Sequence, residues 1–148
     1  EGGLTVDVMR VKQVTDLTPY DAVVIGASVH AGQIPRSLKR FVRKHREGLR
    51  DLPVADFVVC LTMTEDTPEN REQARSYLGQ LHKLAPGLDP VDTGLFAGAV
   101  LAEGEDFARL FPLMKVPVKA MAETQKDQRD WEAIRVWAEG LRRQWEAQ

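Results

Sequence analysis

The fold class is decided by residues 20–32, which read YDAVVIGASVHAG. The four apolar residues from Ala22 to Ile25 do not alternate with polar ones. We therefore expect a strand buried on both faces, as in a parallel sheet covered by helices. Such sheets bind ligands beyond the carboxyl ends of their strands. At that position backbone amides could approach a flat ligand closely along the small residues Gly26, Ala27, Ser28 and Gly32.

Length and composition fit one domain of ordinary size. The chain has 148 residues, of which 43% are apolar and 28% charged. The net charge of −2 argues against a nucleic-acid binder. The single cysteine, Cys60, excludes an intrachain disulfide and favours a reducing, cytoplasmic location. Histidines and carboxylates show no metal-ligand spacing, so we expect no metal site.

The rest of the chain alternates strand and helix patterns. An alternating segment, Leu4 to Val11, predicts an edge strand. Apolar residues at helical spacing predict one helix from Ile34 to about Arg50. Buried strands are expected at 22–29, 54–62 and 94–101.

Two further helices are expected in the second half. Thr67 can cap a helix whose first residue is Pro68. Pro112 and Pro117 break any long helix in an irregular stretch that extends to Asp130. Asp130 caps a last helix, for which we expect one packed face made of Trp131, Ile134, Ala138, Leu141 and Trp145.

Residues 20–32, followed by Phe41-Val42-Arg43-Lys44-His45, resemble the flavodoxin-like proteins of the protoporphyrinogen oxidase (menaquinone-dependent protoporphyrinogen IX dehydrogenase) type. The likeness continues through the loop after Cys60 and residues 96–99 to the helix that opens with Asp130. It implies a flavodoxin-like three-layer α/β/α sandwich on a parallel sheet of order 2-1-3-4-5. We expect residues 1–148 to form a single, N-terminally incomplete domain, since the first strand, first helix and Thr/Ser/Gly-rich phosphate loop have no counterpart here.

The resemblance implies FMN as cofactor, with the loop Ser28–Gly32 along one side of the flavin ring and the loop Leu61–Glu65 along another. Thr62 and Thr64 would donate hydrogen bonds to it, and Met63 would pack on its face. His30 is the one candidate catalytic residue, either as a hydrogen-bond partner at the flavin edge or as a proton donor on the substrate side. Alternatives remain open. The 28–32 loop is otherwise only a tight strand–helix connection, the threonines reflect ordinary loop polarity, and His30 is an exposed loop histidine. The expected cofactor-binding residues are Ala27, Ser28, Val29, His30, Ala31, Gly32, Leu61, Thr62, Met63, Thr64 and Glu65.

The same resemblance implies a function in heme biosynthesis: dehydrogenation of a tetrapyrrole, with electrons passed to a quinone or a redox protein. It also implies peripheral contact with the inner face of the membrane through residues 107–118, while homo-oligomerisation stays open. The basic helix at 34–50 is either a solvated face or an attractor of anionic partners. Two alternatives are a generic flavodoxin-like electron carrier or reductase and a flavin-free interaction domain.

Overall fold

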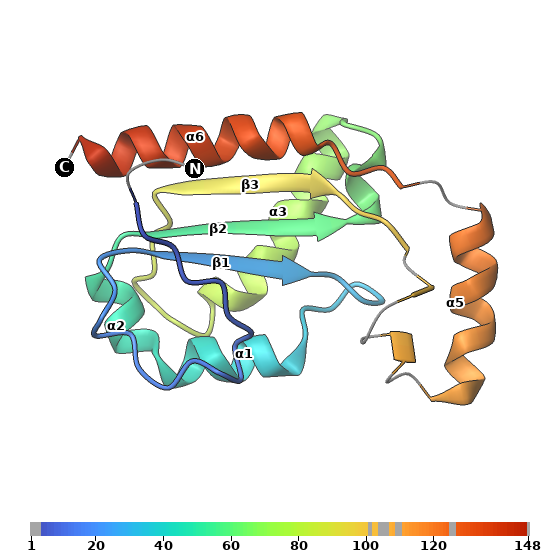
Figure 1. Cartoon of the computed structure of the whole chain (residues 1–148), viewed down its shortest axis with the longest axis horizontal. Helices are drawn as coiled ribbons and strands as arrows, with labels where there is room; N and C mark the ends of the chain where they lie inside the picture. The colour runs from blue at the N-terminus through green and yellow to red at the C-terminus, as the bar shows by residue number, and fades with distance from the viewer. Residues whose placement is uncertain (1–3, 101, 104–106, 109–110, 125–126, 148) are drawn as a thin grey trace.

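The computed structural model describes residues 4–100, 102–103, 107–108, 111–124 and 127–147 (Figure 1). The described elements are β1 (Val23–Ser28), α1 (Arg36–Lys44), α2 (Arg46–Asp51), β2 (Val54–Cys60), the 3₁₀ turn η1 (Leu61–Thr64), α3 (Pro68–His82), β3 (Asp92–Ala97), α5 (Pro112–Thr124) and α6 (Trp131–Glu146).

The strands form a parallel sheet in the order β1-β2-β3. This confirms the three expected strands and their common direction. The expectation that the first strand is buried on both faces is wrong: Ile25 and Ala27 face the core, but Val24 on the other face is 44% exposed, because β1 lies at the edge of the described sheet.

β1 is shorter than expected by one residue at each end, and the bounds of β2 and β3 differ by more. β2 stops at Cys60 because the next four residues coil into η1. β3 starts before Gly94 and ends at Ala97, since its pairing with β2 begins at Val91, whose N–H donates to the Val54 carbonyl.

Helices pack on both faces of the sheet, so the chain folds as a flavodoxin-like α/β sandwich (Figure 1). One face of the sheet carries Ile25, Ala27 and Val58, which are buried with apolar residues of α1 and α3. The other face carries Phe57 and Phe96, on which Trp137 of α6 packs edge-on at ring-centroid distances of 5.8 and 5.5 Å. α5 stands beyond the carboxyl ends of the strands (Figure 1).

A buried carboxylate lies in the middle of the sheet. Asp56 is only 1% exposed and accepts hydrogen bonds from two side chains. The Thr93 hydroxyl donates to its Oδ1 at 2.8 Å, and Nε2 of His82, on α3, lies 2.6 Å from its Oδ2. Because an unpaired buried carboxylate is costly, these two contacts are what makes Asp56 tolerable at this position.

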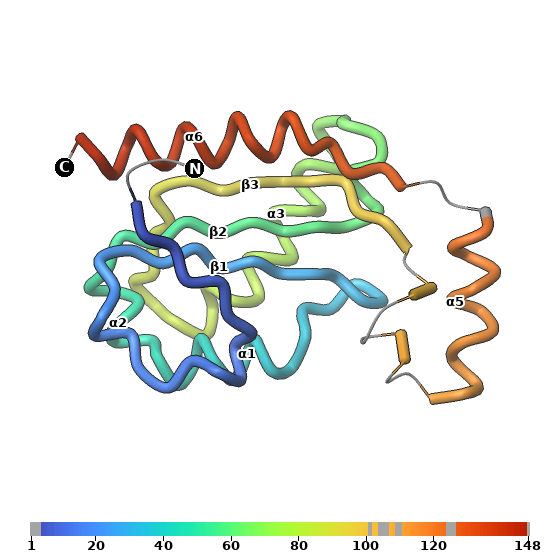
Figure 2. Tube along the Cα trace, in the orientation of Figure 1, coloured from blue at the N-terminus to red at the C-terminus, as the bar shows by residue number. Residues whose placement is uncertain are grey.

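The expected edge strand at residues 4–11 is wrong. Residues 4–10 are exposed and have no regular structure, although Val11 and Val14 pack against the core (Figure 2). A strand needs a neighbour for its backbone N–H and C=O groups. Among the described residues no strand pairs with this segment, so its alternating apolar pattern does not lead to a strand.

Two helix expectations also need correction. The helix expected from Ile34 to Arg50 is divided at His45, where φ is −103° and ψ is 16°, so α2 leaves the axis of α1. The bend brings Leu49 into the core, and the His45 ring packs on Phe41 with centroids 4.9 Å apart. Burial lowers the pKa of His45.

The stretch expected to be irregular contains α5, which begins at Pro112 and includes Pro117. Pro112 occupies the first helical position, where its missing N–H costs nothing. Pro117 removes the N–H that would bond to the carbonyl of Leu113, a residue that is 85% exposed, so water can hydrate that carbonyl. The remainder of the segment, including Arg109 and Leu110, falls partly outside the described residues.

The caps at Thr67 and Asp130 are confirmed: their side chains accept from the N–H groups of Asn70 and Ala133. The packed face of α6 is only partly as expected. Ile134, Leu141 and Trp145 are at least half-buried, but Trp131 and Ala138 are exposed, and Trp137 packs on the sheet instead.

Replacing Thr93 with valine tests the buried carboxylate. Thr93→Val keeps the side-chain shape and removes one donor to Asp56, so we expect a loss of about 1–3 kcal/mol in the free energy of unfolding. Urea denaturation measures it, with Thr5→Val at an exposed threonine as the matched control. Equal stabilities of the two variants would show that the Thr93 hydrogen bond is unimportant.

Candidate functional site

Two loops leave the sheet at the same edge. β1 and β2 are parallel neighbours with Ser28 opposite Val59, so the segments that follow them start side by side. The ladder extends one residue further, where the Val29 N–H donates to the Val59 carbonyl at 3.3 Å. Both segments lie at the arrowhead end of the sheet, the side on which α5 stands (Figure 1).

The first loop is a tight two-residue turn. The N–H groups of His30 and Gln33 each donate to the other's carbonyl at 3.0 Å. Between them Ala31 and Gly32 have φ of 49° and 72°, which defines a turn of type I′. The N–H groups of these two turn residues have no acceptor within the described part of the chain. They are therefore available to an acceptor on a ligand.

Two polar side chains of this loop pair with each other. Ser28 and His30 are both exposed, and the Ser28 Oγ lies 3.0 Å from the His30 Nε2. This contact holds the imidazole at the edge of the sheet.

The second loop begins as η1. Its Leu61 and Thr62 are half-buried, whereas Thr64 and Glu65 are exposed. The start of α3 fixes the loop's end, because the Glu65 carbonyl accepts from the Thr67 N–H at 3.1 Å and from the Asn70 amide at 2.8 Å. The Glu65 carbonyl thus anchors the end of this loop to the first turn of α3, and the buried Met63 side chain anchors its middle to the core.

Side chains of α3 join the two loops. The Gln80 amide donates to the Gly32 carbonyl at 3.2 Å. The Tyr77 hydroxyl lies 3.4 Å from the Thr62 Oγ1 and accepts from the Gln73 amide at 2.9 Å. Sequence reasoning missed these residues, although Gln73, Tyr77 and Gln80 recur at helical spacing beside the apolar stripe of α3.

The structure separates the expected site residues into two groups. Ala27 and Met63 are buried in the core, so Met63 does not present its side chain to a ring as expected. At Gly26, expected to allow close approach of a ligand, the Phe57 ring occupies the space that a Cβ would take, although the residue stays exposed. The residues that reach the surface of the edge are Ser28, Val29, His30, Ala31, Gly32, Leu61, Thr62, Thr64 and Glu65.

Two titratable groups near the second loop have shifted pKa values. Burial raises the pKa of the Cys60 thiol, which keeps it protonated and favours a packing role. A hydrogen bond from Arg71 lowers the pKa of Asp66, whose Oδ2 lies 2.6 Å from the guanidinium. Among the described residues no group of three or more His, Cys, Asp or Glu could hold a metal ion. The polar groups of the edge are the hydroxyls of Ser28, Thr62 and Thr64, the His30 imidazole, the turn N–H groups and the exposed Glu65 carboxylate.

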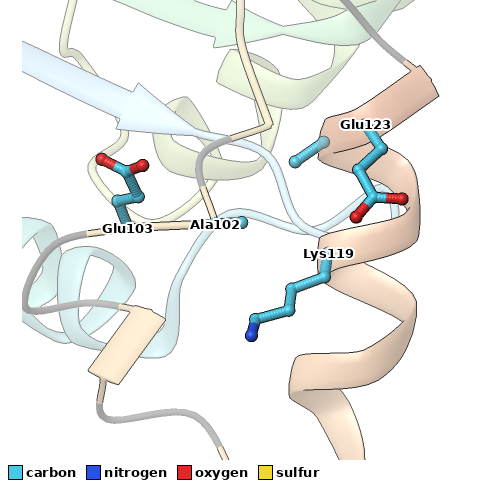
Figure 3. Close-up of a pocket in the computed structure, with 5 residues that line it drawn as sticks. Ala102, Glu103, Lys119 and Glu123 are labelled. Carbon is cyan, nitrogen blue, oxygen red and sulfur yellow. The ribbon is translucent and has the colours of Figure 1, made fainter.

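A pocket of about 420 Å³ lies between residues 102–103 and α5. Figure 3 shows the Lys119 ammonium and the Glu103 and Glu123 carboxylates around this space. Ala102 and Ala122 complete its lining. No helix in the described part of the chain is both long and apolar enough to span a bilayer.

A family model described as a flavodoxin domain matches residues 1–130. The chain therefore belongs to the flavodoxin domain family, in agreement with its parallel sheet and the layers that cover it. Membership supports a flavin-dependent redox role at the level of the family.

More specific likenesses are partial. Three curated proteins, the protoporphyrinogen IX dehydrogenases [quinone] of Escherichia coli strains K12, O6:H1 and O157:H7, are each 34% identical over 83 residues. The match covers 53% of this chain and 46% of each relative, so the chain spans about half the length of the curated relatives it matches.

A solved structure, that of a flavoprotein in complex with FMN from Lactobacillus acidophilus NCFM, matches 56% of this chain and 48% of its own. Its identity of 20% and TM-score of 0.38 are too low to carry an argument.

The type I′ turn can be tested at Ala31, the first of its two central residues, which has a positive φ although it is not a glycine. Ala31→Gly removes a Cβ from the left-handed region, so we expect a gain of up to about 1 kcal/mol in the free energy of unfolding. Ala27→Gly, in β1, is the matched control and should lose about 1 kcal/mol. Chemical denaturation of both variants measures the difference. A loss in Ala31→Gly as large as in the control would contradict the turn geometry.

Proposed function

We propose that the protein, at its natural length, binds FMN at the carboxyl edge of its sheet and acts as an oxidoreductase. The observation that carries the proposal is the convergence of two loops, 28–33 and 61–65, after neighbouring parallel strands. Gln80 and Tyr77 of α3 tie both loops to one helix. Membership of the flavodoxin domain family supports a ligand site at this edge, since doubly wound sheets bind their ligands beyond the carboxyl ends of their strands.

The donors at the edge suit a flavin ring. A flavin carries carbonyl oxygens and ring nitrogens that accept hydrogen bonds. The unpaired N–H groups of Ala31 and Gly32 and the hydroxyls of Thr62 and Thr64 would donate to them. The bound flavin supplies the electron chemistry, while the protein orients it and sets its potential.

His30 would hold the proton of the reaction. An imidazole can carry a proton near neutral pH, and Ser28 keeps this one beside the turn amides. Its ring is exposed, so it can also exchange that proton with water.

For the substrate we propose a reduced tetrapyrrole such as protoporphyrinogen IX, with a quinone as the electron acceptor. The partial likeness to protoporphyrinogen IX dehydrogenases supports this choice. The apolar side chains of α5 support peripheral contact with a membrane that holds the quinone. The most exposed of them are Leu113 and Val116, at 85% and 71%, and Phe111, directly before the helix, is 81% exposed.

A generic electron carrier or reductase is the second candidate. Among the described residues that line the pocket beside α5, there are two carboxylates, Glu103 and Glu123, and one cation, Lys119. This excess of negative charge opposes binding of a substrate with several carboxylates. A carrier that exchanges electrons directly with a protein does not need to bind such a substrate in this pocket, so the repulsion does not arise.

FMN binding tests the first proposal. The purified full-length protein should quench added FMN fluorescence, and riboflavin should bind more weakly if the phosphate is recognised. Ser28→Ala removes the contact that holds His30, so we expect about fivefold weaker FMN binding. Ser76→Ala, on the outer surface of α3, is the matched control and should bind FMN as the wild type does. No quenching by the wild type would reject the flavin site.

The substrate is tested separately with the same flavoprotein. Turnover of protoporphyrinogen IX with menaquinone above the spontaneous oxidation rate would support the tetrapyrrole assignment. No turnover in a protein that binds FMN would reject it and leave the electron carrier.

A further inference from the structure

We infer that the exposed face of α1 is a docking surface for the acidic face of an electron-transfer protein. This surface, the α1 basic face, consists of the exposed side chains of Arg36, Arg40, Arg43 and Lys44. The redox character of the partner rests on the flavin site proposed above. The docking itself does not.

The charges of α1 are segregated from those of the rest of the chain. The whole chain has a net charge of −2, yet α1 reads RSLKRFVRK and contains no acidic residue. Within the described part of the chain, no carboxylate pairs with any member of the α1 basic face. The neighbouring α2 differs, because Arg46 and Arg50 lie 3.8 and 3.6 Å from Glu47 and Asp51.

This arrangement works against the helix itself. Arg36 and Arg40, like Arg40 and Lys44, are four residues apart, where like charges repel. Arg36 also lies at the amino-terminal end of the helix dipole, which disfavours a cation. The buried side chains of Leu38, Phe41 and Val42 hold α1 in place despite this repulsion. An external negative surface would relieve it, so the face is complementary to an acidic partner.

The position of α1 connects this face to the proposed flavin site. Arg36 follows the type I′ turn by only four residues. Lys39, on the same helix, donates from Nζ to the Gln33 Oε1 of that loop at 3.1 Å. A protein docked on α1 would therefore lie beside the edge at which Ser28 and His30 are exposed.

The face fits a protein better than a membrane. Helices that lie on a membrane carry large apolar side chains next to their basic ones. The apolar residues of α1 are buried against the sheet, and every member of the α1 basic face is charged. The exposed large apolar side chains of the described structure lie mostly on α5 and in residues 4–9, with others at Val24, Val91, Trp131 and Val136, and none lies on α1.

The test compares two variants with the same net charge. The first is Arg36→Gln/Arg40→Gln/Arg43→Gln/Lys44→Gln. The control, Lys12→Gln/Arg75→Gln/Lys83→Gln/Arg143→Gln, removes four exposed cations elsewhere. Binding of a labelled acidic [2Fe–2S] ferredoxin to the full-length protein is followed by fluorescence anisotropy over a range of ionic strength. Anionic phospholipid vesicles and a short DNA duplex are the alternative probes.

We expect the first variant to bind the ferredoxin about tenfold more weakly at low ionic strength, and the control to bind like the wild type. Added salt should weaken the wild type and leave the first variant nearly unchanged. Equal binding by the two variants would overturn the inference. So would a loss confined to vesicles or DNA, which would assign the face to a membrane or a nucleic acid.

FMN affinity of each protein is measured in parallel. Docking without FMN binding would reject the flavin proposal alone. FMN binding without docking would reject the present inference alone.

Discussion

The interlock of two glycines and two aromatic rings across the sheet is the constraint on which this structure depends. In the strand register Gly26 of β1 and Gly94 of β3 lie on either side of Phe57. A Cβ at Gly26 would overlap the Phe57 ring, and one at Gly94 would lie 2.5 Å from the Phe96 ring. The Phe57 and Phe96 rings therefore lie over the glycines, with their centroids 6.0 Å apart, and the Trp137 ring packs edge-on against both rings. A shift of register by one residue would move the side chains of the shifted strand to the opposite face of the sheet.

That register also determines where the site lies. Because Ser28 lies opposite Val59, the two loops begin side by side at the same end of the sheet. Gln80 and Tyr77 of α3 then contact one loop each. The sheet is rigid and the donors are in its loops, which is how such folds combine precision with variable chemistry. Asp56, with its partners Thr93 and His82, fixes the position of α3 on the opposite face.

The sequence contained enough information for the three parallel strands and for the caps at Thr67 and Asp130, because these depend on local patterns. It did not reveal that residues 4–11 lack a strand, since pairing depends on a neighbour rather than on alternation. Gly26 illustrates the same limit at the site. A glycine that admits a ligand and one that admits a phenylalanine ring look alike in sequence, and only the register distinguishes them. The Gln80 and Tyr77 anchors join residues that are far apart in the chain.

The central claim is that a flavin binds at the carboxyl edge of this sheet, between the two loops. The most direct measurement is the amide NMR spectrum of the full-length protein during titration with FMN. The account predicts that the largest shift changes occur at Ala31, Gly32 and Thr62, with smaller ones along α3 at Gln80. Changes centred on the opposite ends of the strands, near Val23 and Val54, or no localised change at all, would contradict it.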